Sequence, residues 1–405
     1  MSVQAGAHKP SIVPGSAGPA GTLGVMGGGQ LGRMFVHAAQ RMGYRTAVLD
    51  PDPESPAGLI SHHHVQTDYL DPKGLGAMRQ LCAAITTEFE NIPAPAMQAL
   101  AEHRPVAPAA HALAIAQDRR LEKAHFQRCG VACAPYAVID SEQDLEAASA
   151  ALLPGILKTA RLGYDGKGQR RVRDRAELAT AWADLGCSSC VLEQQLALEA
   201  ECSVLVGRGW DGAMVHFPLQ YNLHRDGILV RTEVIAGRLP PELEARAVAA
   251  ARAVAQGLDY VGVLCVEFFV VRCAQGRPAL LVNEIAPRPH NSGHYTIDAC
   301  DQSQFDLQVR TLAGLPLCQP RQHSPAIMLN LMGDLWFDGQ GGCGAACTPD
   351  WPAVLALPGA HLHLYGKLKA VRARKMGHLT LTGADEARVR ATATQAAALL
   401  GITPD

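Results

Sequence analysis

A glycine-rich turn between a buried strand and a helix is the feature that most constrains this chain. Residues Thr22–Met26 form a short apolar run, and Gly27, Gly29 and Gly32 follow it with the spacing G-x-G-x-x-G. Apolar residues then recur at the spacing of a helix. Three glycines permit a tight turn and let an anion approach the N–H groups at a helix N-terminus. The pattern predicts a strand, an anion-binding turn and a helix, and it leaves the identity of the anion open.

Strands and helices continue to alternate after this turn. Residues 45–50 and 83–87 read as further buried strands, with another strand near Val65. Strands that alternate with helices form a parallel sheet with helices on both of its faces. We therefore expect an α/β, Rossmann-like domain over residues 21–117, preceded by a flexible leader of residues 1–20.

The chain changes character at Asp118, a residue type that favours the N-cap of a helix. The following part is expected to be α+β, because its strands adjoin one another without regular helical crossovers. We expect strands over residues 155–159, 190–194, 201–206, 214–218, 263–271 and 278–284, around a helix over 241–256. Two basic strands over 361–370 and 375–381 and an alanine-rich helix then follow. These patterns divide the remainder into residues 118–316 and a small C-terminal domain, 317–405.

Composition excludes several classes of protein. Apolar residues make up 48% of the 405 residues and charged residues 18%, as in a globular protein rather than a disordered one. The 36 basic and 38 acidic residues nearly cancel, so we expect neither nucleic-acid nor membrane binding. No apolar run approaches the roughly 20 residues of a membrane span. The 12 cysteines are scattered, which favours reduced thiols and a cytoplasmic location.

A second glycine-rich segment lies between two expected strands. Residues 161–169 contain three glycines, and Lys158 stands on the strand before them. Backbone N–H groups of such a loop can bind phosphate oxygens, and a lysine adds a point charge. The segment is not a P-loop, because Gln169 stands where a G-K-[ST] ending and a helix are needed. An ordinary flexible hairpin is the alternative.

Two glutamates interrupt strongly apolar strands. Glu267 and Glu284 each stand among buried apolar neighbours, where a carboxylate is costly unless it is paired or bound to a metal. On neighbouring strands they would suit Mg²⁺, although a buried ion pair with an arginine is the alternative for each. Asn283 points to the opposite face from Glu284 unless the strand carries a bulge.

Two other groups could suggest a metal but are weaker signals. Cys187 and Cys190 form a single C-x-x-C without the second pair that a zinc site needs. His62, His63 and His64 could bind nickel or zinc adventitiously, but a surface histidine cluster is the simpler interpretation.

Four segments together resemble the ATP-grasp ligases and, among them, the 5-(carboxyamino)imidazole ribonucleotide synthetase family of purine biosynthesis. They are Gly27-Gly-Gly-Gln-Leu-Gly-Arg-Met34, Gly163-Tyr-Asp-Gly-Lys-Gly-Gln169, Asn283-Glu-Ile-Ala-Pro-Arg-Pro-His-Asn-Ser-Gly-His294 and Arg374-Lys-Met-Gly-His378. The resemblance covers nearly everything from Thr22 onward. It implies an ATP-grasp fold in which the N-terminal and C-terminal domains complete the substrate site. Residues 234–238 depart from the family pattern, so we give them no role.

The resemblance also implies an ATP site with Mg²⁺. The implied nucleotide contacts are Arg119, Lys158, Gly163, Tyr164, Asp165, Gly166, Lys167, Gly168, Gln169, Glu193, Gln194, Gln195, Leu196, Glu201, His224, Asn283 and Glu284. In this set the cations hold phosphates, the loop acts as a lid, residues 193–196 contact adenine and Glu201 accepts from ribose. Glu267 and Glu284 are the implied ligands of Mg²⁺.

The resemblance further implies a site for an aminoimidazole ribonucleotide. The implied substrate contacts are Gln30, Leu31, Glu88, Tyr164, Arg288, Asn291, Ser292, Lys367 and Arg374. Arg288, Lys367 and Arg374 would hold the 5′-phosphate, although residues 367–375 read alone as a solvated basic face. His294, Arg288 and Lys158 are the implied catalytic residues.

The reaction that follows from this resemblance is the carboxylation of 5-aminoimidazole ribonucleotide with bicarbonate and ATP, through carboxyphosphate. A homodimer is also implied. Three alternatives stay open: another ATP-grasp ligase such as a formate-dependent glycinamide ribonucleotide formyltransferase, a nucleotide sensor without turnover, and a dinucleotide-dependent oxidoreductase. The last would use the first glycine turn and Asp50, which ends the second strand where a ribose-binding acid would stand.

Overall fold

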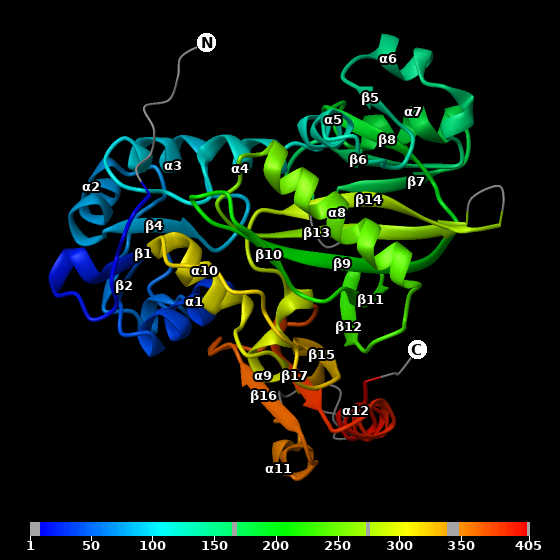
Figure 1. Cartoon of the computed structure of the whole chain (residues 1–405). Helices are drawn as coiled ribbons and strands as arrows, with labels where there is room; N and C mark the ends of the chain where they lie inside the picture. The colour runs from blue at the N-terminus through cyan, green and yellow to red at the C-terminus, as the bar shows by residue number, and fades with distance from the viewer. Residues whose placement is uncertain (1–8, 164–167, 273–275, 338–347, 403–405) are drawn as a thin grey trace.

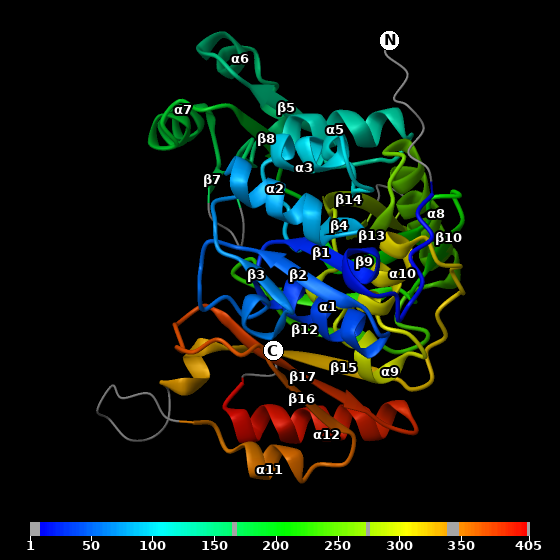
Figure 2. The same ribbon diagram turned by 90° about the vertical axis from the view of Figure 1, so that its left-hand side faces the viewer.

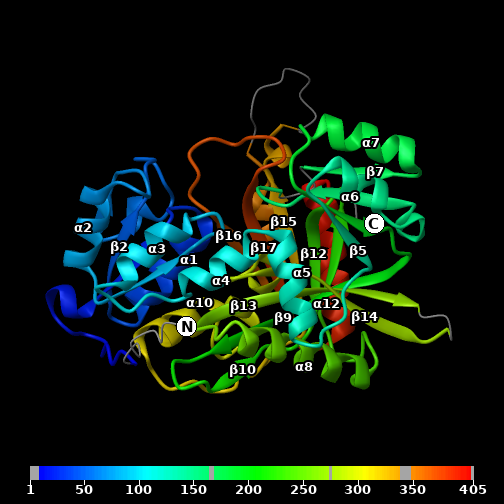
Figure 3. The same ribbon diagram turned by 90° about the horizontal axis from the view of Figure 1, so that it is seen from above.

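The computed structural model describes residues 9–163, 168–272, 276–337 and 348–402, and the strands of these residues form three sheets. The N-terminal sheet lies at one end of the molecule and a small sheet with α6 and α7 at the other (Figures 1 and 3). A long sheet runs between them. The last strands of this sheet lie at the bottom of Figure 2, together with the C-terminal helices.

The first sheet is parallel and has the strand order β3-β2-β1-β4. Its strands are β1 (Thr22–Met26), β2 (Arg45–Leu49), β3 (His63–Val65) and β4 (Ala84–Thr87), with 3₁₀ turns η1 (Gly18–Gly21) and η2 (Gly58–Ile60) beside them. Helix α1 (Gln30–Arg41) packs on one face together with α10 (Gln304–Ala313). Helices α2 (Pro72–Leu81), α3 (Ala94–Ala101) and α4 (Ala110–Ala116) pack on the other. Every residue of β1 is buried, as in strands covered on both faces, so the predicted parallel sheet is confirmed.

The small sheet is antiparallel and has the order β5-β8-β6-β7. It contains β5 (Tyr136–Ile139), β6 (Gly155–Thr159), β7 (Gln169–Val172) and β8 (Cys190–Gln194), with α6 (Glu142–Ala147), η3 (Ala150–Leu152) and α7 (Arg175–Asp184). Helix α5 (Arg119–Arg128) precedes it and begins as predicted, because the Asp118 carboxylate accepts the N–H of Arg120. Strands β6 and β7 form the antiparallel pair expected around the second glycine-rich segment.

The long sheet runs β14-β13-β9-β11-β12-β15-β17-β16, with β10 paired to β9. Its strands are β9 (Leu198–Arg208), β10 (Met214–His216), β11 (Gln220–Arg225), β12 (Ile228–Val234), β13 (Gly262–Arg272), β14 (Pro278–Ala286), β15 (Ala326–Met332), β16 (Ala360–Leu364) and β17 (Lys375–Thr382). Helix α8 (Pro241–Gly257) packs on β9, β13 and β14, and α12 (Glu386–Leu400) packs on β15 and β17. The strands of the C-terminal part therefore extend the same sheet that carries Glu267 and Glu284.

Short elements connect these layers. They are η4 (Asn291–Gly293), α9 (Thr296–Ala299), η5 (Gly333–Trp336) and α11 (Trp351–Leu355). Among the described helices, none combines the length and the apolar character that crossing a membrane requires.

Several elements differ from the sequence-based expectations. The strand expected over 361–370 is wrong beyond Leu364, because the chain turns at Gly366, whose φ of 72° leaves the extended region. Strands β11, β12 and β15 and helix α10 were not predicted. In β11 and β12 polar residues alternate irregularly with apolar ones, so their periodicity is weak.

The described part of the expected flexible leader is instead packed against the first sheet. The Ile12 side chain is 7% exposed within the core formed by α1 and α10. Its N–H donates to the carbonyl of Ala313 at 3.0 Å, and its carbonyl accepts from the Tyr44 hydroxyl at 2.6 Å. Residues 9–20 therefore belong to the folded N-terminal part, while residues 1–8 lie outside the described residues. The expectation was wrong because one buried apolar side chain and two hydrogen bonds to the backbone groups of Ile12 order a segment whose composition alone suggests flexibility.

The packing of Ile12 gives a first prediction. Ile12→Ala should lower the free energy of unfolding by about 2–5 kcal/mol, the range for truncating a buried aliphatic side chain. Val13 is 58% exposed, so Val13→Ala should change it by less than about 0.5 kcal/mol. Urea denaturation of both variants checks this expectation. Equal, negligible effects would mean that the segment is a free leader after all.

Candidate functional site

Most of the residues expected to bind a nucleotide converge between the small sheet and the long sheet. Helix α5 supplies Arg119, β6 supplies Lys158 and β8 supplies Glu193. From the long sheet, β13 and β14 contribute Glu267 and Glu284. The space between the two sheets is therefore bordered by both cations and carboxylates.

A β-bulge brings the carboxylates of β13 and β14 together. Val266 pairs with Ile285 and Phe268 with Val282, so the single residue Glu267 faces both Asn283 and Glu284. A bulge of this kind was the condition for Asn283 to share the site. The Oδ1 atom of Asn283 is buried and has no hydrogen-bond partner among the described residues. Three residues with side-chain oxygen donors thus stand at this bulge, a donor set that fits Mg²⁺.

Each of the two glutamates already has a cationic or polar partner. Glu284 lies 3.0 Å from Arg119, and Glu267 lies 2.9 Å from the Nε2 atom of His290. Burial raises the pKa of the Glu267 carboxyl, but His290 and His224 lower it further, to about 2. Glu267 is therefore charged at neutral pH, as a metal ligand must be. His290 is a contact that sequence reasoning missed.

Two lysines hold the carboxylate of Glu193. The ammonium group of Lys158 lies 2.8 Å from one carboxylate oxygen, and that of Lys123 lies 3.1 Å from the other. Lys123 also donates to the carbonyl of Asn283 at 3.1 Å, so it connects the small sheet to the long sheet. Burial raises the pKa of Glu193, but the two lysines lower it to about 2. The carboxylate is charged and keeps Lys158 in place at the edge of the site.

Glu122 on α5 is another buried carboxyl group, and its pKa is shifted in the opposite direction from that of Glu193. Glu122 is 2% exposed and accepts the N–H of Ile285 at 2.8 Å. Burial raises its pKa to about 8, despite the opposing effects of Arg119 and Lys123. Glu122 is therefore largely protonated at neutral pH in the folded protein.

Sequence reasoning identified Arg119 on α5 but not Glu122 and Lys123. The three residues stand at positions i, i+3 and i+4, which share one face of a helix. A face with three ionisable residues where apolar residues are expected was the available signal, since polar and charged groups on a packed face require partners.

The remaining nucleotide-site residues lie at the end of β8, in its connection to β9, and on β9 and β11. The Nδ1 atom of His224 lies 2.9 Å from Glu201. The N–H groups of Gln194 and Gln195 donate to the carbonyls of Pro135 and Pro154, both at 2.9 Å. Leu196 follows them, half-buried, in the connection to β9.

The described residues on either side of the gap in the second glycine-rich segment contact β6 and α5. Thr159 donates its N–H to the carbonyl of Gly168 at 2.8 Å, and Gln169 pairs with Lys158 across β6 and β7. The carbonyl of Gly163 lies 3.5 Å from an Nη atom of Arg119. Four residues to which the resemblance gives a role, Tyr164, Asp165, Gly166 and Lys167, lie outside the described residues.

The first glycine turn is closed by two carboxylates of the chain itself. Asp50 accepts the N–H of Gly28 at 2.7 Å, and Glu88 accepts those of Gly29 and Gly32 at 2.9 and 3.1 Å. A Cβ atom on Gly29 would lie 2.5 Å from Glu88, so the close approach of this carboxylate explains the glycine. Burial raises the pKa of Glu88, although the two N–H groups stabilise its charged form. Gln30 and Leu31 then begin α1 at the edge of this turn.

A basic pocket lies beside this turn. It has a volume of about 110 Å³ and is lined by Asp52, Glu54, Pro56, Lys367, Leu368, Lys369 and Arg374. Burial and then Arg374 lower the pKa of Lys367, to about 8. Arg288 forms an ion pair with Glu90 and interacts electrostatically with Glu88, which in turn interacts with Lys367. Arg288 and Lys367, two of the cations expected to hold the substrate, therefore both interact with Glu88, but Arg288 is paired with Glu90, a carboxylate that sequence reasoning missed.

His294 is enclosed rather than exposed. It is 1% exposed, and its ring packs 4.7 Å from that of His378 and 5.8 Å from that of Phe305, centre to centre. Burial lowers the pKa of His294 well below its usual range. The Nδ1 atom of His294 lies 3.0 Å from the Nε2 atom of Gln304, and the Oε1 atom of Gln304 accepts the N–H of His290. This orientation of the amide makes Nδ1 of His294 an acceptor, so the neutral ring carries its proton on Nε2.

Asn291 and Ser292, shortly before His294 in the chain, differ in their contacts. Neither polar atom of the buried Asn291 side chain has a hydrogen-bond partner among the described residues. Ser292 accepts from the Ser203 hydroxyl at 2.8 Å and lies 3.0 Å from Nδ1 of His290. Asn291 is therefore available to a ligand, whereas Ser292 stabilises the local structure.

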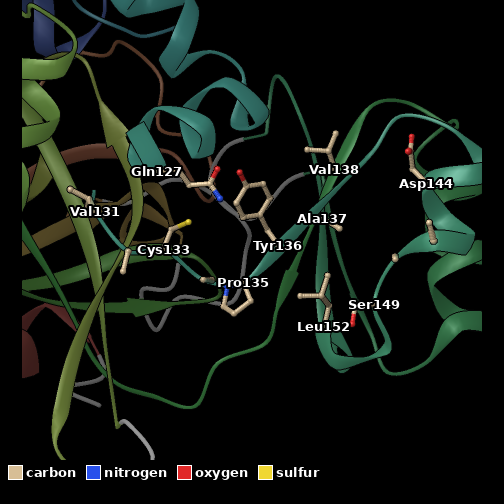
Figure 4. A pocket seen from close by; sticks show the side chains of 14 residues that line it. Gln127, Val131, Cys133, Pro135, Tyr136, Ala137, Val138, Asp144, Ser149 and Leu152 are labelled. Atoms are coloured by element: carbon tan, nitrogen blue, oxygen red, sulfur yellow. The ribbon is translucent and has the colours of Figure 1, made fainter. Parts of the chain in front are cut away.

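A larger pocket lies at the edge of the small sheet. It has a volume of about 770 Å³ and is lined by Gln127, Val131, Ala132, Cys133, Ala134, Pro135, Tyr136, Ala137, Val138, Asp144, Ala147, Ala148, Ser149 and Leu152. Figure 4 shows the side chains of Gln127, from α5, and Tyr136, from β5, with Cys133 beside them. None of these residues belongs to the expected site, so the size of a pocket does not identify the site in this molecule.

Comparison with known families matches the chain in three successive parts. A ribonucleotide synthetase preATP-grasp domain matches residues 20–117, an ATP-grasp domain residues 124–305, and a phosphoribosylaminoimidazole carboxylase C-terminal domain residues 326–392. An N5-carboxyaminoimidazole ribonucleotide synthase of Brucella melitensis is 42% identical over 375 residues, which are 92% of this chain and 98% of that protein.

Solved structures agree with these matches. The structure of N5-carboxyaminoimidazole synthetase from Staphylococcus aureus with ADP has a TM-score of 0.84 and 36% identity, over 96% of this chain and 100% of that one. The Aspergillus clavatus enzyme in complex with ADP and 5-aminoimidazole ribonucleotide has a TM-score of 0.82 and 27% identity, over 94% and 99%. The expected ATP-grasp fold is confirmed.

The protonated state of Glu122 gives a second prediction. Its pKa is about 8 in the folded protein, against an ordinary value of 4.5, so the unfolded chain loses this proton first as the pH rises. Folding stability from this residue is then complete below about pH 4.5 and is lost as the pH rises through 8. Glu122→Gln should keep the fold and show a smaller loss of stability between pH 5 and pH 8 than the parent.

Urea denaturation at several pH values measures this difference. Glu142 is exposed on α6, so Glu142→Gln should leave the parent's profile unchanged and is the matched control. A Glu122→Gln profile that is identical to the parent's would show that Glu122 is ionised in the folded state.

Proposed function

The chain belongs to the N5-carboxyaminoimidazole ribonucleotide synthase family, and on this premise we propose that it carboxylates the exocyclic amine of 5-aminoimidazole ribonucleotide with bicarbonate, converting ATP to ADP and phosphate. The observation that carries this function is the agreement along the whole chain: three family models match in order, and a relative is 42% identical over 92% of it. Neither a shared fold nor a single motif would support the substrate.

The nucleotide is proposed to bind between the small sheet and the long sheet. Lys158 and Arg119 would contact its phosphates, and residues 163–169 would close over them. Both cations are held by carboxylates, Glu193 and Glu284, so they are positioned before the nucleotide arrives. Residues 193–196 would contact the adenine, and Glu201 with His224 would contact the ribose.

Mg²⁺ is proposed to bind at the bulge between β13 and β14. Glu267 and Glu284 would hold it, and the unpartnered Oδ1 atom of Asn283 is a further oxygen donor. The ion would neutralise charge between the β- and γ-phosphates as the phosphoryl group is transferred. If Glu284 binds Mg²⁺, its carboxylate exchanges the contact with Arg119 for one with the ion. The guanidinium group of Arg119 is then free to contact a phosphate.

Bicarbonate is the proposed carboxyl source. An oxygen of bicarbonate attacks the γ-phosphorus, ADP leaves, and carboxyphosphate results. The substrate amine then forms the new N–C bond, either directly or with released CO₂, and phosphate leaves. The chain contributes position and charge rather than a covalent nucleophile.

The proton of the amine is proposed to pass to the departing phosphate. His294 is the alternative acceptor, but its ring is buried and its Nδ1 atom already accepts from Gln304. These contacts support a positioning role for His294, because a general base needs a free lone pair within reach of the proton.

The ribonucleotide is proposed to bind where the first glycine turn meets the basic pocket. Lys367 and Arg374 line that pocket together and would hold the 5′-phosphate, with Arg288 nearby. Gln30, Leu31, Glu88 and Tyr164 would contact the aminoimidazole, and Asn291 with Ser292 would line the carboxylation pocket. The unpartnered amide of Asn291 supports the last assignment.

The contacts of the first glycine turn argue against a dinucleotide-dependent oxidoreductase. A pyrophosphate would need the N–H groups of Gly28, Gly29 and Gly32, which Asp50 and Glu88 already occupy. Two carboxylates would also repel it. The match to a phosphoribosylaminoimidazole carboxylase C-terminal domain likewise disfavours a glycinamide ribonucleotide formyltransferase.

A homodimer, a cytoplasmic location and the division into residues 21–117, 118–316 and 317–405 remain parts of this proposal. They rest on the family resemblance and the sequence patterns.

Release of ADP by the purified protein tests the function. With Mg²⁺, ATP and bicarbonate, ADP formation should rise strongly on addition of 5-aminoimidazole ribonucleotide, and labelled bicarbonate should enter an acid-labile carbamate. Glu284→Gln should abolish this activity and Glu242→Gln, an exposed change on α8, should not. ADP formation without any stimulation by the ribonucleotide would refute the substrate, and binding without turnover would indicate a sensor.

The basic pocket gives a further prediction. Arg374→Ala should raise the KM for the ribonucleotide by about 10-fold or more with little change in kcat, because a phosphate contact is made equally in the ground and transition states. Steady-state kinetics measure both constants, and exposed Arg388→Ala is the control. An unchanged KM would remove Arg374 from the substrate site.

A further inference from the structure

Three histidines meet on one face of the last two strands. His361 and His363 are two residues apart on β16, so their side chains share a face of the sheet. On β17, His378 is the direct partner of His363 in the register. The imidazole of His363 therefore lies opposite that of His378, and the imidazole of His361 lies two residues away on the same strand as His363.

A carboxylate from another element approaches the same three side chains. Asp298 on α9 lies 2.8 Å from Nε2 of His363 and 3.7 Å from Nδ1 of His361. One potential ligand atom from each of Asp298, His363 and His378 lies within 4.8 Å of the other two. Asp298, His363 and His378 thus offer ligand atoms that lie close to one another, and His361 stands beside them with its Nε2 atom 3.0 Å from the Thr382 hydroxyl oxygen.

The inner histidine has an unused donor atom. His378 is fully buried, and its Nδ1 atom lies 3.1 Å from the Tyr365 hydroxyl. Its Nε2 atom is buried without a hydrogen-bond partner among the described residues. A buried polar atom without a partner is costly, and a bound ligand would remove this cost.

The outer side of the cluster is open to solvent. The side chains of His361 and His363 are 39% and 29% exposed, whereas that of Asp298 is 12% exposed. An ion can therefore reach the cluster from the side of β16. The rings of His363 and His378 are stacked, 4.5 Å apart and 13° from parallel, so the partly exposed His363 ring must turn to direct a nitrogen at the ion.

We propose that Asp298, His361, His363 and His378 form a binding site for a divalent transition metal of the zinc class. Imidazole nitrogens with one carboxylate favour Zn²⁺, Co²⁺, Ni²⁺ or Cu²⁺ over Mg²⁺, which prefers oxygen donors. This site uses mainly nitrogen donors and shares no residue with the bulge between β13 and β14, where the side chains offer oxygen donors. A bound ion connects α9 to β16 and β17 and stabilises this junction by binding only the folded chain.

Cobalt provides a direct test, because its visible spectrum reports the number and type of ligands. The full chain, freed of metal with a chelator, is titrated with Co²⁺ in the absence of nucleotide. The expected result is one Co²⁺ bound per chain with the intense visible bands of a four-coordinate site, and displacement of Co²⁺ by Zn²⁺. Zn²⁺ should also raise the Tm.

Two substitutions test which side chains bind the Co²⁺ that gives this spectrum. His363→Gln and, separately, Asp298→Asn should weaken binding by at least about 100-fold, since even the loss of an outer-shell partner of a metal ligand commonly costs 10- to 100-fold. Each variant is first compared with the parent by circular dichroism. Asp298→Asn keeps the shape of the side chain and serves if His363→Gln does not fold.

The histidine cluster over residues 62–64 offers a matched control. Replacing His62, His63 and His64 by Gln removes an adventitious site and should leave the cobalt spectrum and the Zn²⁺-dependent rise in Tm intact. Loss of the signal in this variant, or a signal that survives both His363→Gln and Asp298→Asn, overturns the proposal. The absence of four-coordinate bands in the parent does so as well.

Discussion

The ammonium group of Lys123 is the contact on which the geometry of the candidate site depends. It is fully buried, and a buried charge is tolerated only when it is paired and hydrogen-bonded. Its two partners, the Glu193 carboxylate and the Asn283 carbonyl, belong to different sheets. Glu193 in turn holds Lys158, and the neighbour of Asn283, Glu284, holds Arg119 on the same helix as Lys123. These ion pairs and the hydrogen bond to Asn283 together form a connected network, which fixes the positions of the cations relative to the carboxylates.

Carboxylates also decide the chemistry of the first glycine turn. The turn satisfies the pattern of a dinucleotide site, and its strand and helix form as that pattern predicts. Asp50 and Glu88, however, occupy the N–H groups that the pattern provides. The glycines allow these side chains to approach the backbone, so the same motif here brings two carboxylates against the N–H groups of the turn. A motif therefore predicts the backbone, whereas the neighbouring side chains decide the ligand.

The sequence predicted the elements that have strong periodicity and missed contacts between distant residues. The strands β1, β6 and β8 agree closely with the apolar runs that predicted them, because a fully buried strand leaves a clear signal. The pairing of Lys123 with Glu193 and of Arg288 with Glu90 is not visible in a single sequence, since it depends on how sheets dock. The role of Asn283 was correctly tied to a bulge, but only the register of β13 and β14 reveals that bulge. The family resemblance supplied the substrate, which no pattern of spacing could have given.

Helix α10 completes the hydrophobic core of the first sheet although it begins 217 residues after β4, the last strand of that sheet, a separation on the order of the domain sizes that fold alone. Phe305, Val309 and Leu312 are buried in that core beside α1. While the chain is being synthesised, the apolar face of α1 stays uncovered until residue 313 has left the ribosome. We therefore expect the N-terminal part to finish folding late, together with the ATP-binding part, and a fragment that ends before α10 to aggregate.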